Sequence, residues 1–269
     1  MRFRRGAVPL AAALAFTALV GCAAQSDAGP AAGEASASDA TSGAELSGTL
    51  TVFAAASLTD TFDALADDFE RQHPSVDVVL NYGGSSALAQ QIVSGAPADV
   101  FAAASEATMQ TVVSEGLATE AVVFATNTLE LVVPPGNPGN VTGLADLARP
   151  ELAIALCDPV VPCGAAAEKL LAAAEVAASP DTLEEDVKAV VTKVLLGEAD
   201  AGLVYVTDVR AAGAEVEGIE VPDAAAALNL YPVTALADAP SPLLAQAWVA
   251  LLTGPDGQAA LAEAGFGAP

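Results

Sequence analysis

The sequence predicts an α/β protein built from two lobes, and three observations lead to this prediction. A buried strand, a serine and an amphipathic helix follow one another three times between residues 49 and 116. An extended run and a Pro/Gly/Asn turn cluster at 128–140 then break the pattern, and a second set of strands and helices follows. Strands that alternate with helices indicate parallel strands joined by right-handed crossovers.

The first strand is predicted at 49–56 (TLTVFAAA), and Ser57 stands where the following helix begins. That helix ends before Pro74 and carries an apolar face at spacings of four, three and four residues, formed by Leu58, Phe62, Leu65 and Phe69. The strand VDVVLNY follows, then Gly83-Gly84 and a helix from about Ser86 to Ser94. The strand ADVFAAA comes next, and Ser105 caps a helix that stops near Gly116.

The second set begins with the strand ELAIALC and two helices, at 163–178 and at 182–197. The strand AGLVYV and the segment LNLYPVTAL precede two closing helices, around Trp248 and around Gln258. These helices are free to return to the first lobe. We therefore assign residues 48–128 and 232–269 to lobe I and residues 129–231 to lobe II.

The N-terminal residues are predicted to lie outside the folded body. Residues 1–22 combine a basic start with an apolar stretch too short to span a membrane comfortably, and they end at Cys22. The stretch LVGC resembles the lipobox of bacterial lipoproteins, in which the cysteine is acylated; an ordinary secretory signal is the alternative. Residues 23–47 hold no aromatic side chain and read as a flexible tether.

The charge excludes a nucleic-acid partner. Removal of the leader leaves six basic residues against 34 acidic ones, a net charge of −28. Such a body repels nucleic acid and anionic lipid surfaces. Cys157 and Cys163 remain after Cys22, and an even pair in an exported protein suggests a disulfide, with two buried thiols as the alternative.

The sequence offers few residues that could support enzyme catalysis. The single histidine, His73, precedes Pro74 at a helix end. No HExxH pair, Gly-x-Ser-x-Gly elbow or phosphate-binding loop occurs, and a nucleophilic serine would have no base. We therefore expect a binding protein without a cofactor.

Helix starts that follow strands are candidate anion sites, because their N–H groups are unpaired and their dipoles are positive there. Ser57, Ser85 and Cys163 occupy such places, Val187 is placed in the first turn of its helix, and Tyr205 lies at the end of a strand. Cys163 and Val187 offer only a main-chain N–H, which any residue has, so the sequence pattern alone does not single them out. The other three also have an ordinary structural interpretation. Ser57 and Ser85 suit helix caps, Ser86 could cap while Ser85 faces outward, and a tyrosine such as Tyr205 is often half-buried.

Five segments together resemble the molybdate-binding proteins of ABC importers: VFAAASLTD, YGGSSALAQQIVSGAPADVFAAAS, CDPVVPCG, EEDVKAVV and GLVYVTD. The resemblance runs from Leu50 to Phe266. It implies a two-lobed periplasmic-binding-protein fold of type II, each lobe a mixed sheet flanked by helices, with the ligand in the cleft between the lobes.

The resemblance also implies a ligand set without any basic side chain. The oxyanion would be held through its oxygens by the hydroxyl and N–H of Ser57 and Ser85, the N–H groups of Cys163 and Val187, and the hydroxyl of Tyr205, with no direct ligand to the metal. The family commonly has alanine where this chain has Cys163. A main-chain N–H survives that change.

The expected function is capture of molybdate or tungstate by a monomeric, lipid-anchored extracytoplasmic protein that delivers it to an ABC importer permease. The same fold could instead serve sulfate, thiosulfate or ferric iron; Tyr82 and Tyr205 are the tyrosines that could approach iron. A secreted hydrolase with Ser57 or Ser85 as its nucleophile is the alternative from another class.

Overall fold

The computed structural model describes residues 45–269. The predicted leader, Cys22 and most of the predicted tether lie outside these residues. Within the described part of the chain, no helix combines the length and the apolar character that crossing a bilayer requires.

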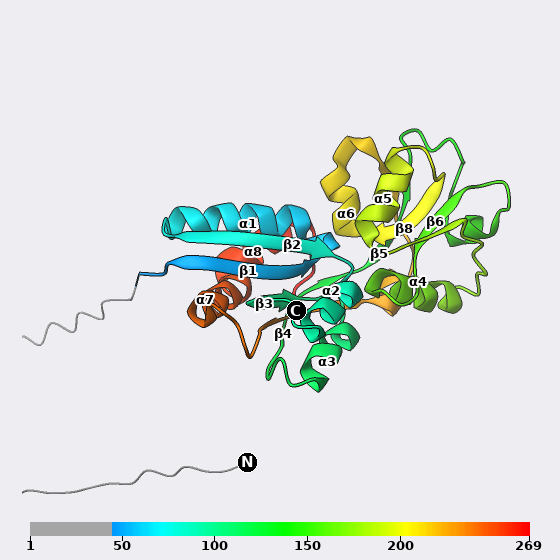
Figure 1. Cartoon of the computed structure of the whole chain (residues 1–269). Helices are drawn as coiled ribbons and strands as arrows, with labels where there is room; N and C mark the ends of the chain where they lie inside the picture. The colour runs from blue at the N-terminus through cyan, green and yellow to red at the C-terminus, as the bar shows by residue number, and fades with distance from the viewer. Residues whose placement is uncertain (1–44) are drawn as a thin grey trace, which may run out of the picture. The chain divides into compact units, whose positions relative to one another are not determined.

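The first lobe contains a five-stranded mixed sheet with the order β2-β1-β3-β10-β4 (Figure 1). Strand β1 pairs in parallel with β2 and β3, whereas β10 runs antiparallel to β3 and β4. The strands are β1 (Gly48–Ala55), β2 (Val76–Gly83), β3 (Val100–Ala102), β4 (Val122–Asn127) and β10 (Asn229–Ala235).

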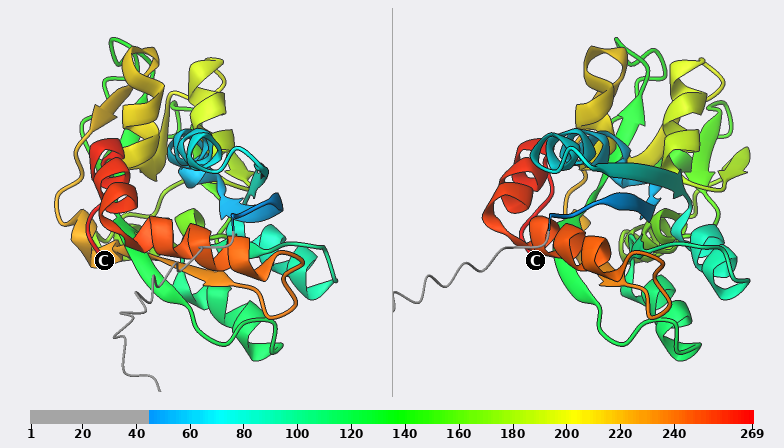
Figure 2. Two further views of the ribbon diagram at one scale, coloured as in Figure 1. Left: turned by 90° about the vertical axis from the view of Figure 1, so that its left-hand side faces the viewer. Right: turned by 60° about the vertical axis from the view of Figure 1, so that its left-hand side comes forward.

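Helices cover both faces of this sheet. They are α1 (Thr59–Gln72), α2 (Ser85–Val93), α3 (Glu106–Ser114), α7 (Pro242–Thr253) and α8 (Pro255–Ala264), with the short 3₁₀ turn η1 (Ala56–Leu58) before α1. One face packs on α1, α7 and α8, where Trp248 contacts Phe62 and Phe69 edge-on at ring-centroid distances of 5.6 Å. The other face packs on α2 and α3. Figure 2 shows the closing helices, in orange and red, beside the blue N-terminal strand.

The second lobe is built on another five-stranded mixed sheet, with the order β7-β6-β8-β5-β9. Its strands are β5 (Leu129–Val133), β6 (Ile154–Cys157), β7 (Thr182–Glu184), β8 (Ala201–Tyr205) and β9 (Glu217–Ile219). Its helices are α4 (Pro162–Ala173), α5 (Val187–Leu195) and α6 (Val206–Ala212), with the 3₁₀ turns η2 (Leu144–Ala148), η3 (Gly213–Glu215) and η4 (Ala224–Ala227). Two mixed sheets flanked by helices confirm the predicted fold class.

The chain passes between the sheets twice, from β4 to β5 and from η4 to β10. The first passage falls at Thr128, between the end of β4 and the start of β5. The second falls before Asn229, because residues 229–231 already pair with β4. Residues 229–231 therefore belong to the first sheet, although the sequence boundary at 232 placed them in lobe II.

Two other sequence interpretations are corrected by strand pairing. The segment 182–197 was expected to be one helix, but Thr182–Glu184 pairs in parallel with Ala155–Cys157 and the helix begins at Val187. Strand β4 was not predicted at all; its partner β10 lies about a hundred residues later in the chain. Pairing with a distant segment decides the conformation of both short runs.

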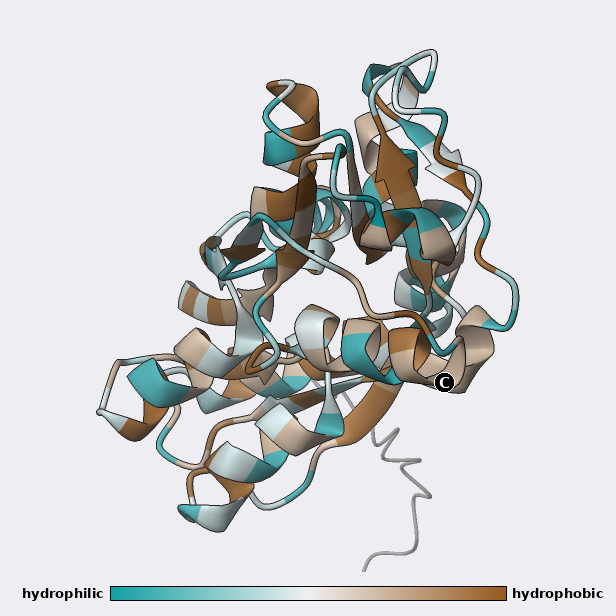
Figure 3. Ribbon diagram, turned by 90° about the vertical axis from the view of Figure 1, so that its right-hand side faces the viewer, coloured by the Kyte–Doolittle hydropathy of each residue, from teal (hydrophilic) through white to brown (hydrophobic). Residues whose placement is uncertain are grey.

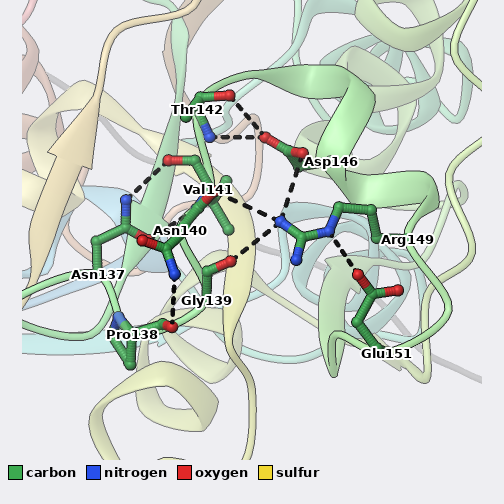
Figure 4. Close-up of polar contacts among 9 residues, drawn as sticks. All are labelled: Asn137, Pro138, Gly139, Asn140, Val141, Thr142, Asp146, Arg149 and Glu151. Carbon is green, nitrogen blue, oxygen red and sulfur yellow. Dashed lines mark hydrogen bonds and ion pairs between the residues drawn. The ribbon is translucent and has the colours of Figure 1, made fainter.

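The predicted turn cluster after β5 is held by side chains, as Figure 4 shows. The Asn137 side chain donates to the Val141 carbonyl and accepts its N–H, at 2.8 and 2.9 Å. Arg149 donates to the Gly139 carbonyl at 3.0 Å. Figure 3 shows helices that alternate hydrophilic and hydrophobic colour, as expected for helices with one face on a sheet.

Candidate functional site

A small cavity of about 20 Å³ lies where strand ends and helix starts of the two lobes meet. A single water needs about 10–15 Å³ on this measure, so the cavity is tight. Its wall is formed by Ala55, Ala56, Ser57, Gly83, Gly84, Ser85 and Ala104 of the first lobe and by Val161, Pro162, Cys163, Asp186, Val187 and Tyr205 of the second. The structure therefore brings all five residues of the ligand set that the resemblance implies to one cavity.

Three helices, α2, α4 and α5, begin at this cavity. Cys163 lies in the first turn of α4 and Val187 is the first residue of α5. Neither N–H has an acceptor among residues 45–269. Unpaired N–H groups and the positive ends of helix dipoles make an anion site without a cationic side chain. The one charged residue of the wall, Asp186, caps α5 by accepting the N–H of Ala189 at 2.9 Å.

Ser57 does not cap a helix through its side chain. It lies in the 3₁₀ turn η1, is 6% exposed, and its Oγ is 2.9 Å from the hydroxyl of Tyr231. Tyr231 comes from β10, which belongs to the same lobe but lies 174 residues later in the chain. The contact fixes the Ser57 hydroxyl at the cavity wall.

Ser85 is the first residue of α2 and is 1% exposed. Its Oγ accepts the N–H of Ala104 at 3.0 Å, and no acceptor for its proton is found in the described part of the chain. A hydroxyl has one donor and two acceptor sites, so Ser85 can still donate to a ligand. The Ser85 side chain therefore stabilises the fold through Ala104 and can still donate a hydrogen bond to a ligand in the cavity.

Ser86 does not have the role expected of it. The N-cap of α2 is Gly84, and no side chain caps this helix. The Ser86 hydroxyl instead donates to the carbonyl of Val160 in the second lobe, at 2.7 Å. Ser105, in contrast, is confirmed as a cap, since its side chain accepts the N–H of Thr108.

Tyr205 ends β8 with its ring fully buried, at 1% exposure. Its hydroxyl accepts a hydrogen bond from Asn229 Nδ2 at 3.0 Å, and Asn229 also donates to the Ala104 carbonyl. Burial first, and then the neighbouring Tyr231 and Asp208, raise the pKa of the Tyr205 phenol well above its ordinary value. Tyr205 therefore keeps its proton and can act as a donor at the cavity.

Cys157 and Cys163 form a disulfide, with Cα atoms 5.8 Å apart. The bridge ties the end of β6 to the first turn of α4 and so encloses the loop that carries Val161 and Pro162. The Asp158 carbonyl lies against this helix start, because a Cβ at Gly164 would come within 2.0 Å of it. This wall of the cavity is therefore covalently closed and tightly packed.

The lobes approach closely beside the cavity. A Cβ built on Gly84, in the first lobe, would lie 2.3 Å from the carbonyl oxygen of Glu185, in the second. Real contacts of this kind are essentially never shorter than 3.0 Å. Glycine is thus required at position 84 for the two lobes to meet as they do.

Sequence reasoning missed two polar residues at the site, Asn229 and Tyr231. Both come from β10, whose segment LNLYPVTAL was interpreted only as a run that leads to the two closing helices. The signal available was a polar asparagine in the apolar run LNLYPV, because a buried amide needs partners. Those partners, Tyr205 and Ala104, could not be identified from sequence spacing.

The arrangement gives little support to the hydrolase and iron alternatives. Neither Ser57 nor Ser85 has a basic partner within residues 45–269, and the His73 ring packs at a tilt against Phe69 at the end of α1. Tyr82 does not line the cavity, and its hydroxyl donates to Asp63 at 2.8 Å. No group of three or more His, Cys, Asp or Glu residues in the described chain is placed to hold a metal ion.

The fold and the site are those of a two-lobed solute-binding protein, and the comparisons with known proteins agree with this class. The profile of the family described as bacterial extracellular solute-binding protein matches residues 50–267. This chain belongs to that family.

Among its relatives, the molybdate-binding protein ModA of Mycobacterium tuberculosis H37Rv is 39% identical over 261 residues, which are 97% of each chain. The solved periplasmic molybdate-binding protein of Azotobacter vinelandii superposes with a TM-score of 0.70 at 24% identity, covering 82% of this chain and 99% of that one. The sulfate-binding protein SubI of M. tuberculosis superposes with a TM-score of 0.69 at 20% identity, covering 81% and 86%. These two superpositions show the two-lobed type II fold.

Proposed function

We propose that this protein captures molybdate, and tungstate as its near-isostere, between its two lobes and delivers it to the permease of an ABC importer. The observation that carries the proposal is the convergence of hydroxyl and N–H donors from both lobes on one cavity whose wall has no lysine or arginine. The 39% identity to a protein named for molybdate binding favours molybdate among the possible oxyanions.

The proposed ligand contacts are the hydroxyls of Ser57, Ser85 and Tyr205 and the N–H groups of Ser57, Ser85, Cys163 and Val187. A hydrogen bond to a charged group contributes roughly 1.5–3 kcal/mol net. A helix start adds about 0.3–2 kcal/mol where an anion lies in its first turn. Several such contacts can together offset the dehydration of a dianion, which no single contact could.

Because the donors come from both lobes, the ligand favours the closed form through contacts that the open form cannot complete. A permease can then recognise the closed form. The proposal includes acylation of Cys22 as an anchor on the outer face of the membrane, a monomeric body and no cofactor. It includes no enzymatic step.

Isothermal titration calorimetry with molybdate, tungstate, sulfate and phosphate tests the proposal. We expect tight binding of molybdate and tungstate and a much weaker response to the other two. Phosphate that retains a proton is disfavoured because hydroxyl and N–H donors offer its O–H no acceptor. Tight binding of sulfate with no response to molybdate would reject the proposal in favour of a sulfate receptor.

Substitution of the first helical residue of α5 tests the N–H contact itself. Proline fits the first helical position and deletes its N–H, so Val187→Pro should reduce the affinity for molybdate at least tenfold, since a hydrogen bond to a charged group is lost. Because the Val187 side chain is buried, Val187→Ala, which keeps the N–H, measures the part of the loss that is due to packing. Glu106→Pro is the matched control, because Glu106 is the first residue of α3 and does not line the cavity. Equal affinities in the two proline variants would remove Val187 from the ligand set.

A further inference from the structure

Lys188 lies between two carboxylates, one in each lobe. Its Nζ is 2.6 Å from Asp60 Oδ2, on α1 of the first lobe, and 3.6 Å from Asp208 Oδ1, on α6 of the second. Of the ion pairs within residues 45–269, the pair of Lys188 with Asp60 alone joins the two lobes. This lysine also directly follows Val187, which lines the cavity.

Asp208 is an unusual partner because its side chain is completely buried. Its Oδ2 accepts the N–H of Tyr205 at 3.1 Å, but its Oδ1 has no hydrogen-bond partner in the described chain. A buried oxygen without a partner is costly unless a nearby group can satisfy it. Lys188 is the charged group that stands near this oxygen, just beyond hydrogen-bond distance.

We infer that Lys188 is a positioning residue for ligand capture: it latches the closed lobes by pairing with Asp60, and Asp208 keeps it in place when the lobes part. This inference rests on the proposed function, because it concerns how that site opens and closes. On opening, Asp60 leaves with α1, and Lys188 can move the short remaining distance to Asp208 Oδ1. In the open form the Lys188 ammonium group is then still paired, and its side chain samples few rotamers. The Lys188 side chain therefore loses less conformational entropy when the lobes close again.

Substitution of Asp60 separates the latch from a simple effect of charge. If Lys188 acted only as a distant positive charge that attracts a dianion, Asp60→Asn would remove a competing negative charge and tighten binding. If Lys188 acts as a latch, the same substitution removes the contact between the lobes and weakens binding. The two explanations predict opposite signs for one variant.

The chain offers matched controls for both members of the pair. Asp67 lies on the exposed side of α1 without an ion pair among the described residues, so Asp67→Asn makes the same change of charge on the same helix. Lys193 lies on α5 with 32% side-chain exposure, against 31% for Lys188, and pairs with Glu198 inside the second lobe. Lys193→Met therefore reports the general effect of losing one lysine from this helix.

The experiment is calorimetric titration of the full mature protein with molybdate at pH 8, which lies above the pKa of about 7 that burial gives Asp208. We expect Asp60→Asn to weaken binding about two- to fivefold, the range for a partly exposed ion pair, and added salt to reduce the difference from wild type. Asp67→Asn should bind as tightly as wild type or slightly more tightly. An Asp60→Asn variant that binds as tightly as its Asp67→Asn control would overturn the latch while leaving the proposed function intact.

If the wild-type protein does not bind molybdate, the proposed function is rejected. A second measurement, made without ligand, then tests the latch by itself. Spin labels placed at the exposed Leu243 of α7 and Leu196 at the end of α5 report the separation of the lobes without any ligand. The latch requires Asp60→Asn and Lys188→Met to shift this separation to longer distances and Lys193→Met to leave it unchanged. Identical distance distributions in wild type and Asp60→Asn would overturn it.

Discussion

Gly84→Ala is the substitution whose effect on capture follows most directly from the structure. Gly84 precedes α2 in the first lobe, and its added methyl carbon would lie 2.3 Å from the carbonyl oxygen of Glu185 in the second. The obstacle is main chain, which cannot rotate away as a flexible side chain could. The two lobes would have to part by roughly 1 Å at this point to reach an ordinary contact distance.

The expected cost falls on closure and not on folding. Overpacking of this kind costs about 1–3 kcal/mol, which corresponds to a loss of affinity of about 5- to 150-fold. Gly84 has φ −59° and ψ 125°, values that alanine adopts without strain. The free energy of unfolding of the ligand-free protein should therefore stay the same or rise by about 0.4–1 kcal/mol, because alanine restricts the unfolded chain.

Calorimetry with molybdate measures the affinity, and urea denaturation of the ligand-free protein measures the stability. Gly83→Ala is the matched control, since Gly83 lines the same cavity wall but a Cβ there would meet only Leu88 of its own lobe, at an ordinary 3.7 Å. Molybdate affinities within twofold of each other for the two variants would refute the reasoning that closure brings Gly84 against Glu185. A large loss of stability in Gly84→Ala alone would show instead that the contact belongs to the folded core.

Three further outcomes are expected. Ser86→Ala removes the exposed hydrogen bond to Val160 across the lobes and should weaken molybdate binding about two- to tenfold at unchanged melting temperature, as calorimetry and thermal denaturation would show. Asp208→Asn should gain stability relative to wild type as the pH rises. Burial raises the pKa of Asp208 to about 7 from 3.8, so between these two pH values the folded protein keeps a proton that the unfolded chain has lost. The contribution of this carboxyl to stability therefore falls as the pH rises over this range and levels off once the pH has passed 7. Between pH 5 and pH 8 the change is roughly 2–3 kcal/mol, and urea denaturation that shows a pH-independent difference would contradict it. Replacement of both Cys157 and Cys163 by serine should lower the free energy of unfolding by about 2 kcal/mol, because the unfolded chain regains the entropy that a short closed loop removes. An unchanged midpoint of urea denaturation would contradict this expectation.

Local patterns were sufficient for the elements with strong periodicity. The apolar spacing of α1 and the serine before α3 are properties of neighbouring residues, and the structure bears both out. Strand β7 escaped prediction because its three residues continue into the helix-forming run EEDVKAVV without a break. Only pairing with β6 makes that segment a strand, and such pairing depends on a residue some 27 positions away.

The sequence by itself determined the strands and helices that have strong local patterns, because capping, glycine and apolar spacing act over a few residues. The resemblance to a known family, carried by five sequence segments, named five of the residues that line the cavity. Only the tertiary structure decided which partners these residues and the neighbouring Ser86 have: the Ser85 hydroxyl accepts the Ala104 N–H, the Tyr205 hydroxyl accepts a hydrogen bond from Asn229, and the Ser86 hydroxyl donates to the Val160 carbonyl of the other lobe. Hydrogen bonds and contacts between the lobes join groups that are distant in the chain, and their geometry exists only once both sheets have formed and met.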